Sequence, residues 1–277
     1  MRKISQATYD GMDNGVYSAA SAQWWQPDSA FYQMKVSFNP VRVGYARKIL
    51  IDDLKIDPQA TAALDVGCGG GYVTEEVARM GFETTGVDPS EPSLRVAAAH
   101  ARENGLAIRY VTGVGESLPF DDQSFGVAFC CDVLEHTRDL PKVIAEISRV
   151  LKPGGAFCYD TLNRTWLSFM AAIKVSQVWK RWAFMPPDLH VWKMFIRPRE
   201  MKSLLRRHGL EWKEHRGMMP NVPVPRILGY LRKRAAGEWT YAELARKIQM
   251  VESRVTAVMY MGYAVKKELG QGRHRPG

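Results

Sequence analysis

The stretch Asp65-Val66-Gly67-Cys68-Gly69-Gly70-Gly71 decides the fold of this 277-residue chain. The apolar residues 62–66 predict a buried parallel strand, and residues 74–80 predict the helix that follows it. Between them lie four glycines, at which the backbone can come close to a ligand. The stretch therefore predicts a cofactor-binding turn between a strand and a helix.

The spacing of the glycines and the acid before them indicate which ligand fits. A dinucleotide fingerprint spaces its glycines G-x-G-x-x-G around a pyrophosphate, whereas this turn reads G-C-G-G-G after Asp65 and Val66. The Asp65 carboxylate would repel a pyrophosphate but suits a cationic amine or sulfonium. Asp88 ends a second short strand, where a carboxylate can accept hydrogen bonds from both ribose hydroxyls. S-adenosylmethionine fits the charge of Asp65, but NAD would want the same acid at Asp88, so Asp88 alone does not decide between the two cofactors.

Five motifs, in order, resemble those of the class I S-adenosylmethionine-dependent methyltransferases. They are L-D-V-G-C-G-G-G at 64–71, G-V-D at 86–88, E-S-L-P-F at 116–120, V-L-E-H at 133–136 and L-K-P-G-G at 151–155. The resemblance implies that Gly67 and Gly69 line the methionine part of the cofactor, and that Asp88 binds the ribose. It also places Gly115 and Glu116 beside the adenine. Cys68, Pro89 and Cys131 complete the expected cofactor-binding set.

Flanking motifs narrow the resemblance to the ubiquinone biosynthesis O-methyltransferases, which methylate a phenol hydroxyl on a polyprenylated ring. These motifs are W-W-Q-P at 24–27, F-N-P-V-R-V-G-Y at 38–45, T-L-N-R at 161–164 and H-V-W-K-M-F-I-R-P at 190–198. The resemblance implies that Arg42 contacts the cofactor. It also implies a Mg²⁺ or Zn²⁺ site at Asp132, Glu135 and His136, where Asp132 replaces the usual Glu. Leu-Glu-His also follows this strand in methyltransferases that use no metal, so both interpretations stay open.

Two histidines are candidates for the base that a hydroxyl acceptor requires. Methyl transfer to a hydroxyl needs removal of a proton, and histidine titrates near neutral pH. His136 follows the fourth expected strand, and His190 lies in a segment that matches the ubiquinone enzymes. Each could instead cap a helix or bond a loop carbonyl. Asp65 is expected to orient the cofactor amine, a role compatible with stabilising the turn.

Strand and helix signals alternate along the chain and predict one α/β domain with a doubly wound, Rossmann-like, mostly parallel sheet. Strands are expected at 62–66, 83–87, 108–112, 127–131 and 156–161, with helices near residues 74, 91, 142 and 201. A last strand within 256–266 should enter antiparallel, as the resemblance implies, after a helix over 240–252. We expect a helical N-terminal lid at 17–56, a cofactor-binding core at 60–163, a substrate-side cap at 164–255 and a disordered tail at 270–277.

Charge and composition bear on partners and location. The net charge is +9, and much of it is local, because residues 197–234 hold 11 Lys or Arg against 3 acids. Such a basic surface could bind an anionic lipid or an acidic carrier protein, or it could simply be a face exposed to solvent. Nucleic acid is not favoured. Residues 166–187 combine tryptophans and cations without an acid, which predicts a helix that either lies at a membrane surface or caps the substrate pocket. Residues 219–225 predict a proline-rich loop on the substrate side.

The lack of a membrane span, of a signal peptide and of paired cysteines favours a cytoplasmic protein. If it contacts a membrane, we expect it to lie at the inner face as a peripheral protein. No apolar run reaches the length of a membrane span, and the start M-R-K-I-S-Q lacks a signal core. The four cysteines lack metal-binding spacing and suggest reduced thiols. The oligomeric state is left open.

The sequence therefore predicts an S-adenosylmethionine-dependent O-methyltransferase. Its expected acceptor is a phenolic or quinol-like hydroxyl of a small, aromatic molecule that could be lipid-linked. N-methylation, carboxyl methylation or a non-catalytic S-adenosylmethionine-binding subunit would use the same cofactor site and stay open. An NAD oxidoreductase is disfavoured because the dinucleotide fingerprint is missing.

Overall fold

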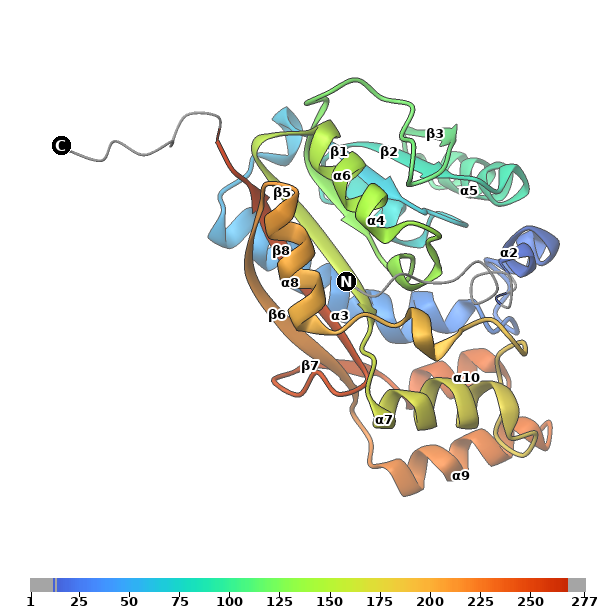
Figure 1. Cartoon of the computed structure of the whole chain (residues 1–277). Coiled ribbons are helices and arrows are strands. Elements are labelled where there is room, and N and C mark those ends of the chain that lie inside the picture. The colour runs from blue at the N-terminus through green and yellow to red at the C-terminus, as the bar shows by residue number, and fades with distance from the viewer. Residues whose placement is uncertain (1–11, 13, 269–277) are drawn as a thin grey trace.

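Eight strands of the described residues form a single sheet with the order β3-β2-β1-β4-β5-β8-β6-β7. The computed structural model describes residue 12 and residues 14–268 (Figure 1). The strands are β1 Ala62–Val66, β2 Glu83–Asp88, β3 Ile108–Thr112, β4 Phe125–Cys130, β5 Leu151–Leu162, β6 Leu210–Pro220, β7 Met250–Ser253 and β8 Met259–Lys266. β1 to β5 pair in parallel, and β8 enters antiparallel between β5 and β6. The predicted doubly wound α/β fold and its antiparallel last strand are confirmed.

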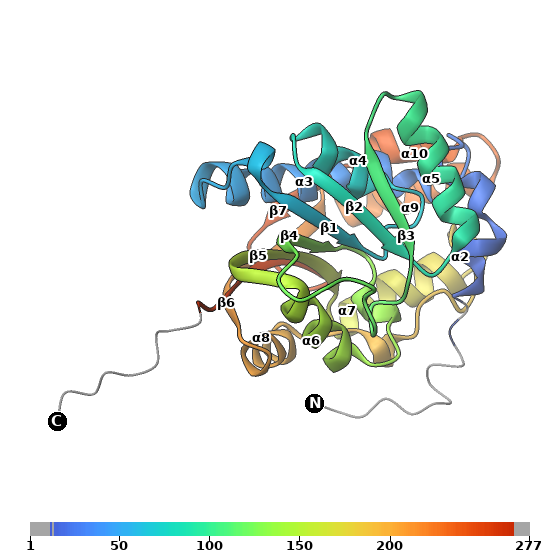
Figure 2. The ribbon, with the colours of Figure 1, turned by 90° about the horizontal axis from the view of Figure 1, so that it is seen from above.

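Helices cover both faces of this sheet (Figure 2). The α-helices are α2 Gly15–Ala19, α3 Asn39–Arg47, α4 Tyr72–Arg79, α5 Glu91–Glu103, α6 Leu140–Val150, α7 Trp166–Ser168, α8 Pro198–Arg207, α9 Val224–Ala235 and α10 Tyr241–Lys247. Short 3₁₀ or π-helical segments are η1 Ser21–Gln23, η2 Met34–Phe38, η3 Lys48–Asp53, η4 Pro58–Ala60, η5 Leu134–His136, η6 Phe169–Val178 and η7 Trp192–Met194. Figure 2 shows α3, α4 and α5 on one side of the sheet and α6 and α8 on the other.

The two-residue period of the strands explains how both faces become buried. On β1, Leu64 and Val66 pack with α6 and α8, whereas Ala63 packs on the opposite side with α3 and α4. β4 and β5 divide their apolar side chains between the same two clusters, since successive strand residues point to opposite faces. The central strands are thus buried on both faces. This burial holds the strands in place, and with them the edge of the sheet at which β1, β2, β4 and β5 end.

The N-terminal prediction needs a correction. Residues 17–56 were expected to form a helical lid, but residues 24–31 form turns and irregular backbone after η1, and helical structure resumes at Tyr32. Pro27 lacks a backbone N–H and restricts the residue before it, which opposes a continuous helix there. Pro40 does lie at the start of α3, although π-helical η2 runs directly into it.

The C-terminal half departs further from the sequence prediction. The helix expected over 240–252 ends at Lys247, and β7 forms the sheet edge in its place. β6 was not predicted, and the proline-rich stretch 219–225 instead joins the end of β6 to the start of α9. Both strands are partly exposed and carry charges, so neither shows a clear apolar alternation.

The segment predicted as a helix over 166–187 is helical only to Val178. Residues 179–187 form turns and coil, so Trp179 and Trp182 do not share a helical face with Trp166. Among the described residues, no helix combines the length and the apolar character that crossing a bilayer requires. The predicted tail at 270–277 and the opening residues 1–6 lie outside the described residues.

Candidate active site

The glycine turn is held against the ends of β1 and β2 by backbone hydrogen bonds. Gly67 N and Cys68 N both donate to Val87 O, at 2.8 and 3.1 Å. Gly69 N donates to Asp88 Oδ2 at 2.9 Å, and Ser90 N donates to Asp88 Oδ1 at 2.8 Å. Gly67 and Gly69 have φ of 73° and 51°, a region that L side chains rarely occupy. Asp88 is thereby fixed at the carboxyl edge, with further lone pairs available to a ligand.

A cavity of about 480 Å³ opens at this edge of the sheet. Turns after β1, β2, β3 and β4 contribute to its walls, and small-molecule sites commonly measure about 300–1,000 Å³. All ten residues predicted to bind the cofactor line it, namely Arg42, Asp65, Gly67, Cys68, Gly69, Asp88, Pro89, Gly115, Glu116 and Cys131. The structure therefore brings together residues that are up to 89 positions apart, from Arg42 to Cys131.

Asp65 lies in a desolvated position beside the cavity. Only 2% of its surface is exposed, and its Oδ2 accepts a hydrogen bond from Thr74 Oγ1 at 2.7 Å. Burial raises the pKa of Asp65 to about 6, although the Thr74 hydrogen bond and Arg42 oppose that rise. Above that pH Asp65 adds a negative charge to a wall that also holds Asp88, Glu116 and Asp132, which suits a cationic ligand.

Arg42 reaches from α3 to two carboxylates at the ends of β4 and β5. Its Nη2 lies 2.5 Å from Asp132 Oδ2, and its Nε lies 3.1 Å from Asp160 Oδ2 without hydrogen-bond geometry. Asp132 N also donates to Asp160 Oδ1 at 2.9 Å. Asp132 has a φ of 55°, and this tight turn directs its side chain to Arg42. The Arg42 charge is thus balanced within the protein before any ligand binds.

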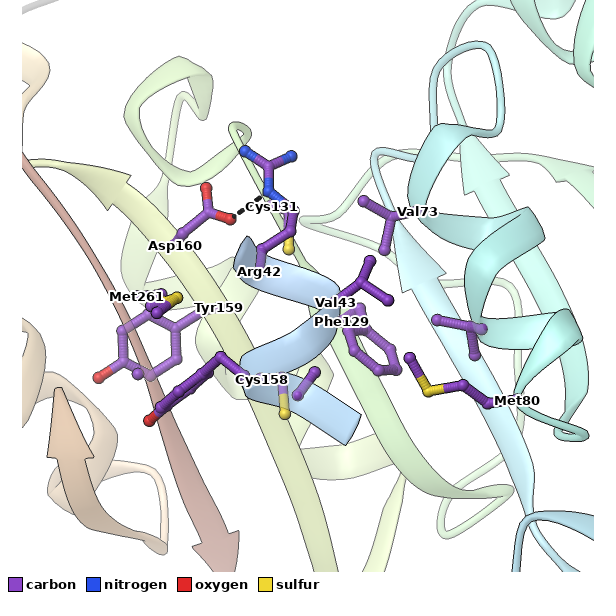
Figure 3. Close-up of a pocket in the computed structure, with 14 residues that line it drawn as sticks. Arg42, Val43, Val73, Met80, Phe129, Cys131, Cys158, Tyr159, Asp160 and Met261 are labelled. Carbon is purple, nitrogen blue, oxygen red and sulfur yellow. Dashed lines mark ion pairs between the residues drawn. The ribbon is translucent and has the colours of Figure 1, made fainter. Parts of the chain in front are cut away.

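A second, smaller space adjoins Arg42 on the side of α3 that faces the sheet (Figure 3). It measures about 10 Å³ and is lined by Val73, Met80, Phe129 and Met261, among others. A space of this size holds at most one water molecule. We therefore assign no ligand to it and treat the larger cavity as the site.

The two predicted catalytic histidines lie side by side, with ring centroids 5.0 Å apart. His136 lines the cavity and is 8% exposed, and burial lowers its pKa well below its usual value. His190 does not belong to the cavity lining; burial lowers its pKa to about 4, and its Nδ1 has no hydrogen-bond partner. Both rings are thus neutral near pH 7, and only His136 faces the cavity.

Two of the three predicted metal ligands, Glu135 and His136, lie in one cluster of donor atoms, and Asp132 lies outside it. Asp132 is engaged by Arg42, while donor atoms of Glu135, His136 and His190 lie within 4.8 Å of one another. Glu135 accepts a hydrogen bond from Thr161 Oγ1, and burial, with a contribution from Asp132, raises its pKa to about 8. A carboxyl group that keeps its proton near neutral pH is a weak metal ligand until it ionises. Glu135 and His136 of the expected set thus lie together, with His190 as their third neighbour where Asp132 was expected, and metal binding stays a prediction.

An N-terminal strap, residues 14–25, covers the cavity. Trp24 packs directly on the glycine turn, where a Cβ at Gly69 or Gly70 would lie within 2.8 Å of its side chain, and Trp24 Nε1 donates to Ser93 Oγ. Trp25 Nε1 donates to Gly70 O at 3.0 Å. Tyr17 stacks near Trp24, and its hydroxyl lies 3.5 Å from His136 Nε2.

The sequence prediction missed the part that this strap plays. Asn14, Tyr17, Ser18 and Trp24 all line the cavity. The sequence marks Trp24 only as part of a family motif, and the short polar stretch before it carries no local signal. Its importance arises from contacts with residues far along the chain, such as the pairing of Asn14 with His136, 122 positions away.

Comparisons with known proteins agree with this architecture. A family model described as a methyltransferase domain matches residues 64–159. The ubiquinone biosynthesis O-methyltransferase of Rhizobium etli is 32% identical over 227 residues, which cover 80% of this chain and 90% of that protein. The enzyme of the same name from Caulobacter vibrioides is 37% identical over 204 residues, covering 71% and 79%.

Solved structures with low sequence identity share the fold. A possible histamine N-methyltransferase from Thermotoga maritima aligns with a TM-score of 0.56 at 18% identity, over 91% of this chain and 97% of its own. A putative methyltransferase from Bacillus halodurans gives 0.55 at 20% identity, over 81% and 100%. The relatives found by sequence identify the family as well as the fold, because they match over most of their length. This chain belongs to the ubiquinone biosynthesis O-methyltransferase family and is an S-adenosylmethionine-dependent methyltransferase.

Proposed function

We propose that this enzyme transfers a methyl group from S-adenosylmethionine to a phenolic or quinol-like hydroxyl of a small aromatic molecule. The observation that carries the proposal is the cavity of about 480 Å³ at the carboxyl edge, where the predicted cofactor residues and a neutral histidine meet. The relatives named ubiquinone biosynthesis O-methyltransferase support a hydroxyl on a quinone-related ring.

The lining fits a cationic donor that carries a ribose and an adenine. In our proposal Asp88 accepts hydrogen bonds from the ribose hydroxyls, and the backbone-anchored geometry of its carboxylate prepares it for them. Asp65 lies near the amino acid end, where its charge suits the amine. Gly115 and Glu116 border the adenine side, while Arg42 contacts the donor from within its own ion-pair network.

His136 is the proposed acceptor of the proton from the substrate hydroxyl. When bound, S-adenosylmethionine supplies a methyl group on a sulfonium, an electrophile that needs no further activation. The oxygen–carbon bond forms as the sulfur–carbon bond breaks, and the hydroxyl proton moves to the neutral imidazole. His190, the other predicted base, is placed beside His136 and supports its ring rather than meeting the substrate.

A panel of acceptors tests this function. Purified protein is incubated with S-adenosylmethionine and a catechol with or without a prenyl tail, and with the matching aromatic amine and aromatic acid. Mass spectrometry then measures the methylated product. We expect product from the phenols, and a His136→Gln variant should lose about 10²–10⁴-fold in turnover. Product from the amine or acid alone would indicate N- or carboxyl methylation, and donor binding without any product would indicate a non-catalytic subunit.

Mg²⁺ or Zn²⁺ dependence stays a prediction. Its support is the proximity of Glu135, His136 and His190, since imidazole and carboxylate are common ligands of divalent ions. Such an ion would acidify a phenol hydroxyl when bound. Turnover is measured in chelator and again after metal is restored. Full activity in chelator would remove the metal from the reaction.

We also propose peripheral contact with an anionic membrane through residues 166–187. Trp166, Leu167, Val178 and Trp179 are 71%, 48%, 51% and 40% exposed, in a segment with three cations and no acid. Exposed rings and apolar side chains suit the headgroup region, and cations attract anionic lipid. The contact would bring a lipid-linked acceptor to the enzyme.

Vesicle sedimentation tests this surface. The wild type should sediment with anionic vesicles, and a Trp166→Ala, Trp179→Ala variant should remain in the supernatant. The matched control is Val251→Ala, Val255→Ala, which removes exposed apolar side chains from β7 and the loop after it, outside residues 166–187. Equal sedimentation of all three proteins would contradict a membrane role for the tryptophans.

A further inference from the structure

Asn14, on the strap, forms a two-point contact with His136. Its Nδ2 donates to the backbone carbonyl oxygen of His136 at 3.2 Å. Its Oδ1 lies 3.2 Å from Nδ1 of the same imidazole. The two contacts join one amide group to one residue, so they fix both the Asn14 side chain and the ring.

The first of these contacts decides which way the amide faces. A backbone carbonyl oxygen can only accept a hydrogen bond, so the group facing it must be the Asn14 nitrogen. The amide oxygen then faces Nδ1 of His136, and an amide oxygen can only accept. Nδ1 must therefore carry the hydrogen. The carbonyl thus removes the ambiguity that usually attaches to amide orientation and histidine tautomer.

The second nitrogen follows from the first. A neutral imidazole has a single N–H, so a hydrogen on Nδ1 leaves a lone pair on Nε2. Nε2 lies 3.5 Å from the hydroxyl of Tyr17, which lines the cavity. Free histidine prefers the opposite tautomer, with the hydrogen on Nε2. Without Asn14 the ring would therefore tend to present an N–H donor where the reaction requires an acceptor.

We propose that Asn14 is a positioning residue that holds His136 as the Nδ1–H tautomer and so keeps the Nε2 lone pair on the Tyr17 side of the cavity. The catalytic part of this inference rests on the proposed function, in which His136 accepts the proton. The partner of one ring nitrogen sets the state of the other, as in other catalytic and metal-bound histidines. Asn14 itself need not touch the substrate.

Two substitutions of Asn14 separate its acceptor from its bulk. Asn14→Asp keeps an oxygen for the Nδ1–H, whereas Asn14→Leu keeps the size and loses it. Nitrogen NMR of protein labelled with ¹⁵N-histidine, recorded at pH 8, reports which ring nitrogen carries the hydrogen; His136→Gln assigns the signal. We expect Nδ1–H in the wild type and in Asn14→Asp, and a population of Nε2–H in Asn14→Leu.

Turnover should follow the tautomer. Asn14→Leu should reduce kcat about 10–100-fold, the usual effect of removing a partner that orients a functional histidine, and Asn14→Asp should restore most of it. Ser18→Ala is the control, because it removes another bond of the strap, to Ser90 Oγ, without touching His136. It should leave the His136 tautomer as in the wild type.

The proposal is overturned if the wild type carries its hydrogen on Nε2, or if Asn14→Leu retains the Nδ1–H form. It is also overturned if the tautomer changes in Asn14→Leu while kcat does not. Because the NMR measurement needs no acceptor, it decides the tautomer even if no phenol is methylated, and that separate result would instead contradict the proposed function.

Discussion

Replacing Asp65 by asparagine should make the protein more stable at neutral pH and a poorer binder of the donor. Asparagine has nearly the same shape and can still accept the hydrogen bond from Thr74 Oγ1. It removes a negative charge from a position that is only 2% exposed. The substitution therefore isolates the cost of keeping this carboxylate ionised inside the protein.

The size of the effect follows from the pKa of Asp65. Burial raises that pKa from the ordinary 3.8 to about 6, so between these values the folded state holds a proton that the unfolded state has lost. Stability contributed by this group is therefore lost as the pH rises from 3.8 to 6, and the loss is complete above that. Since each pKa unit corresponds to about 1.4 kcal/mol, the cost above pH 7 is on the order of 3 kcal/mol. Because the hydrogen bond from Thr74 is weaker to a neutral acceptor, we expect a net gain of about 1–3 kcal/mol for Asp65→Asn.

Urea unfolding at pH 8 and at pH 4.5 measures this difference. The midpoint for Asp65→Asn should exceed that of the wild type at pH 8, and the two should approach each other at pH 4.5. Asp52→Asn, at an exposed position, serves as the control and should show no such gain. Calorimetry should show weaker donor binding by Asp65→Asn. A variant no more stable than the wild type at pH 8, or a gain that does not change with pH, would refute the argument.

Two further substitutions test the walls of the cavity. Asp88→Ala should weaken donor binding by about 1–3 kcal/mol, because buried hydrogen bonds to a carboxylate are lost, and unchanged affinity in calorimetry would remove Asp88 from the site. Gly70→Ala should destabilise the protein by about 1–3 kcal/mol in thermal unfolding, through overpacking, because its Cβ would lie 2.4 Å from Trp24 Cγ. Gly44→Ala, on α3 with nothing within 4 Å of the added Cβ, is its control, and the usual gain at such a helical site is about 0.5–1 kcal/mol. Equal effects of the two glycine substitutions would show that Trp24 does not press on the turn.

The elements predicted most accurately from the sequence are those that depend on a local pattern of residues. β1 and β3 begin and end where expected, because each is a short apolar run bounded by a turn or by polar residues. The meeting of the predicted cofactor-binding residues at one cavity was also predictable, since parallel strands bring their carboxyl ends to one edge and the motif residues follow those ends. Placing Asp65 and Asp88 at this edge needed only the order of the strands.

The remainder depended on contacts between distant segments. β7 forms because Met250–Ser253 pairs with β6, and nothing in its own four residues distinguishes it from the helix before it. Asp132 was expected at a metal, but its partner Arg42 lies 90 positions earlier in the chain. The sequence pattern predicts a helix that includes residues 17–25 of the strap, whereas Trp24 and Trp25 of the strap contact the glycine turn. Such contacts are decided by packing, which overrides local propensity.

The position of Trp24 has a consequence for the timing of each catalytic cycle. The indole packs on Gly69 and Gly70 and also lines the cavity, so a ligand that contacts these glycines must either contact Trp24 or displace it. Loop motions, rather than bond making, set the rate in many enzymes. If the indole must swing aside for the donor to reach the turn, each turnover would include one opening and one closing, and the frequency of that motion would limit how fast methyl groups are delivered.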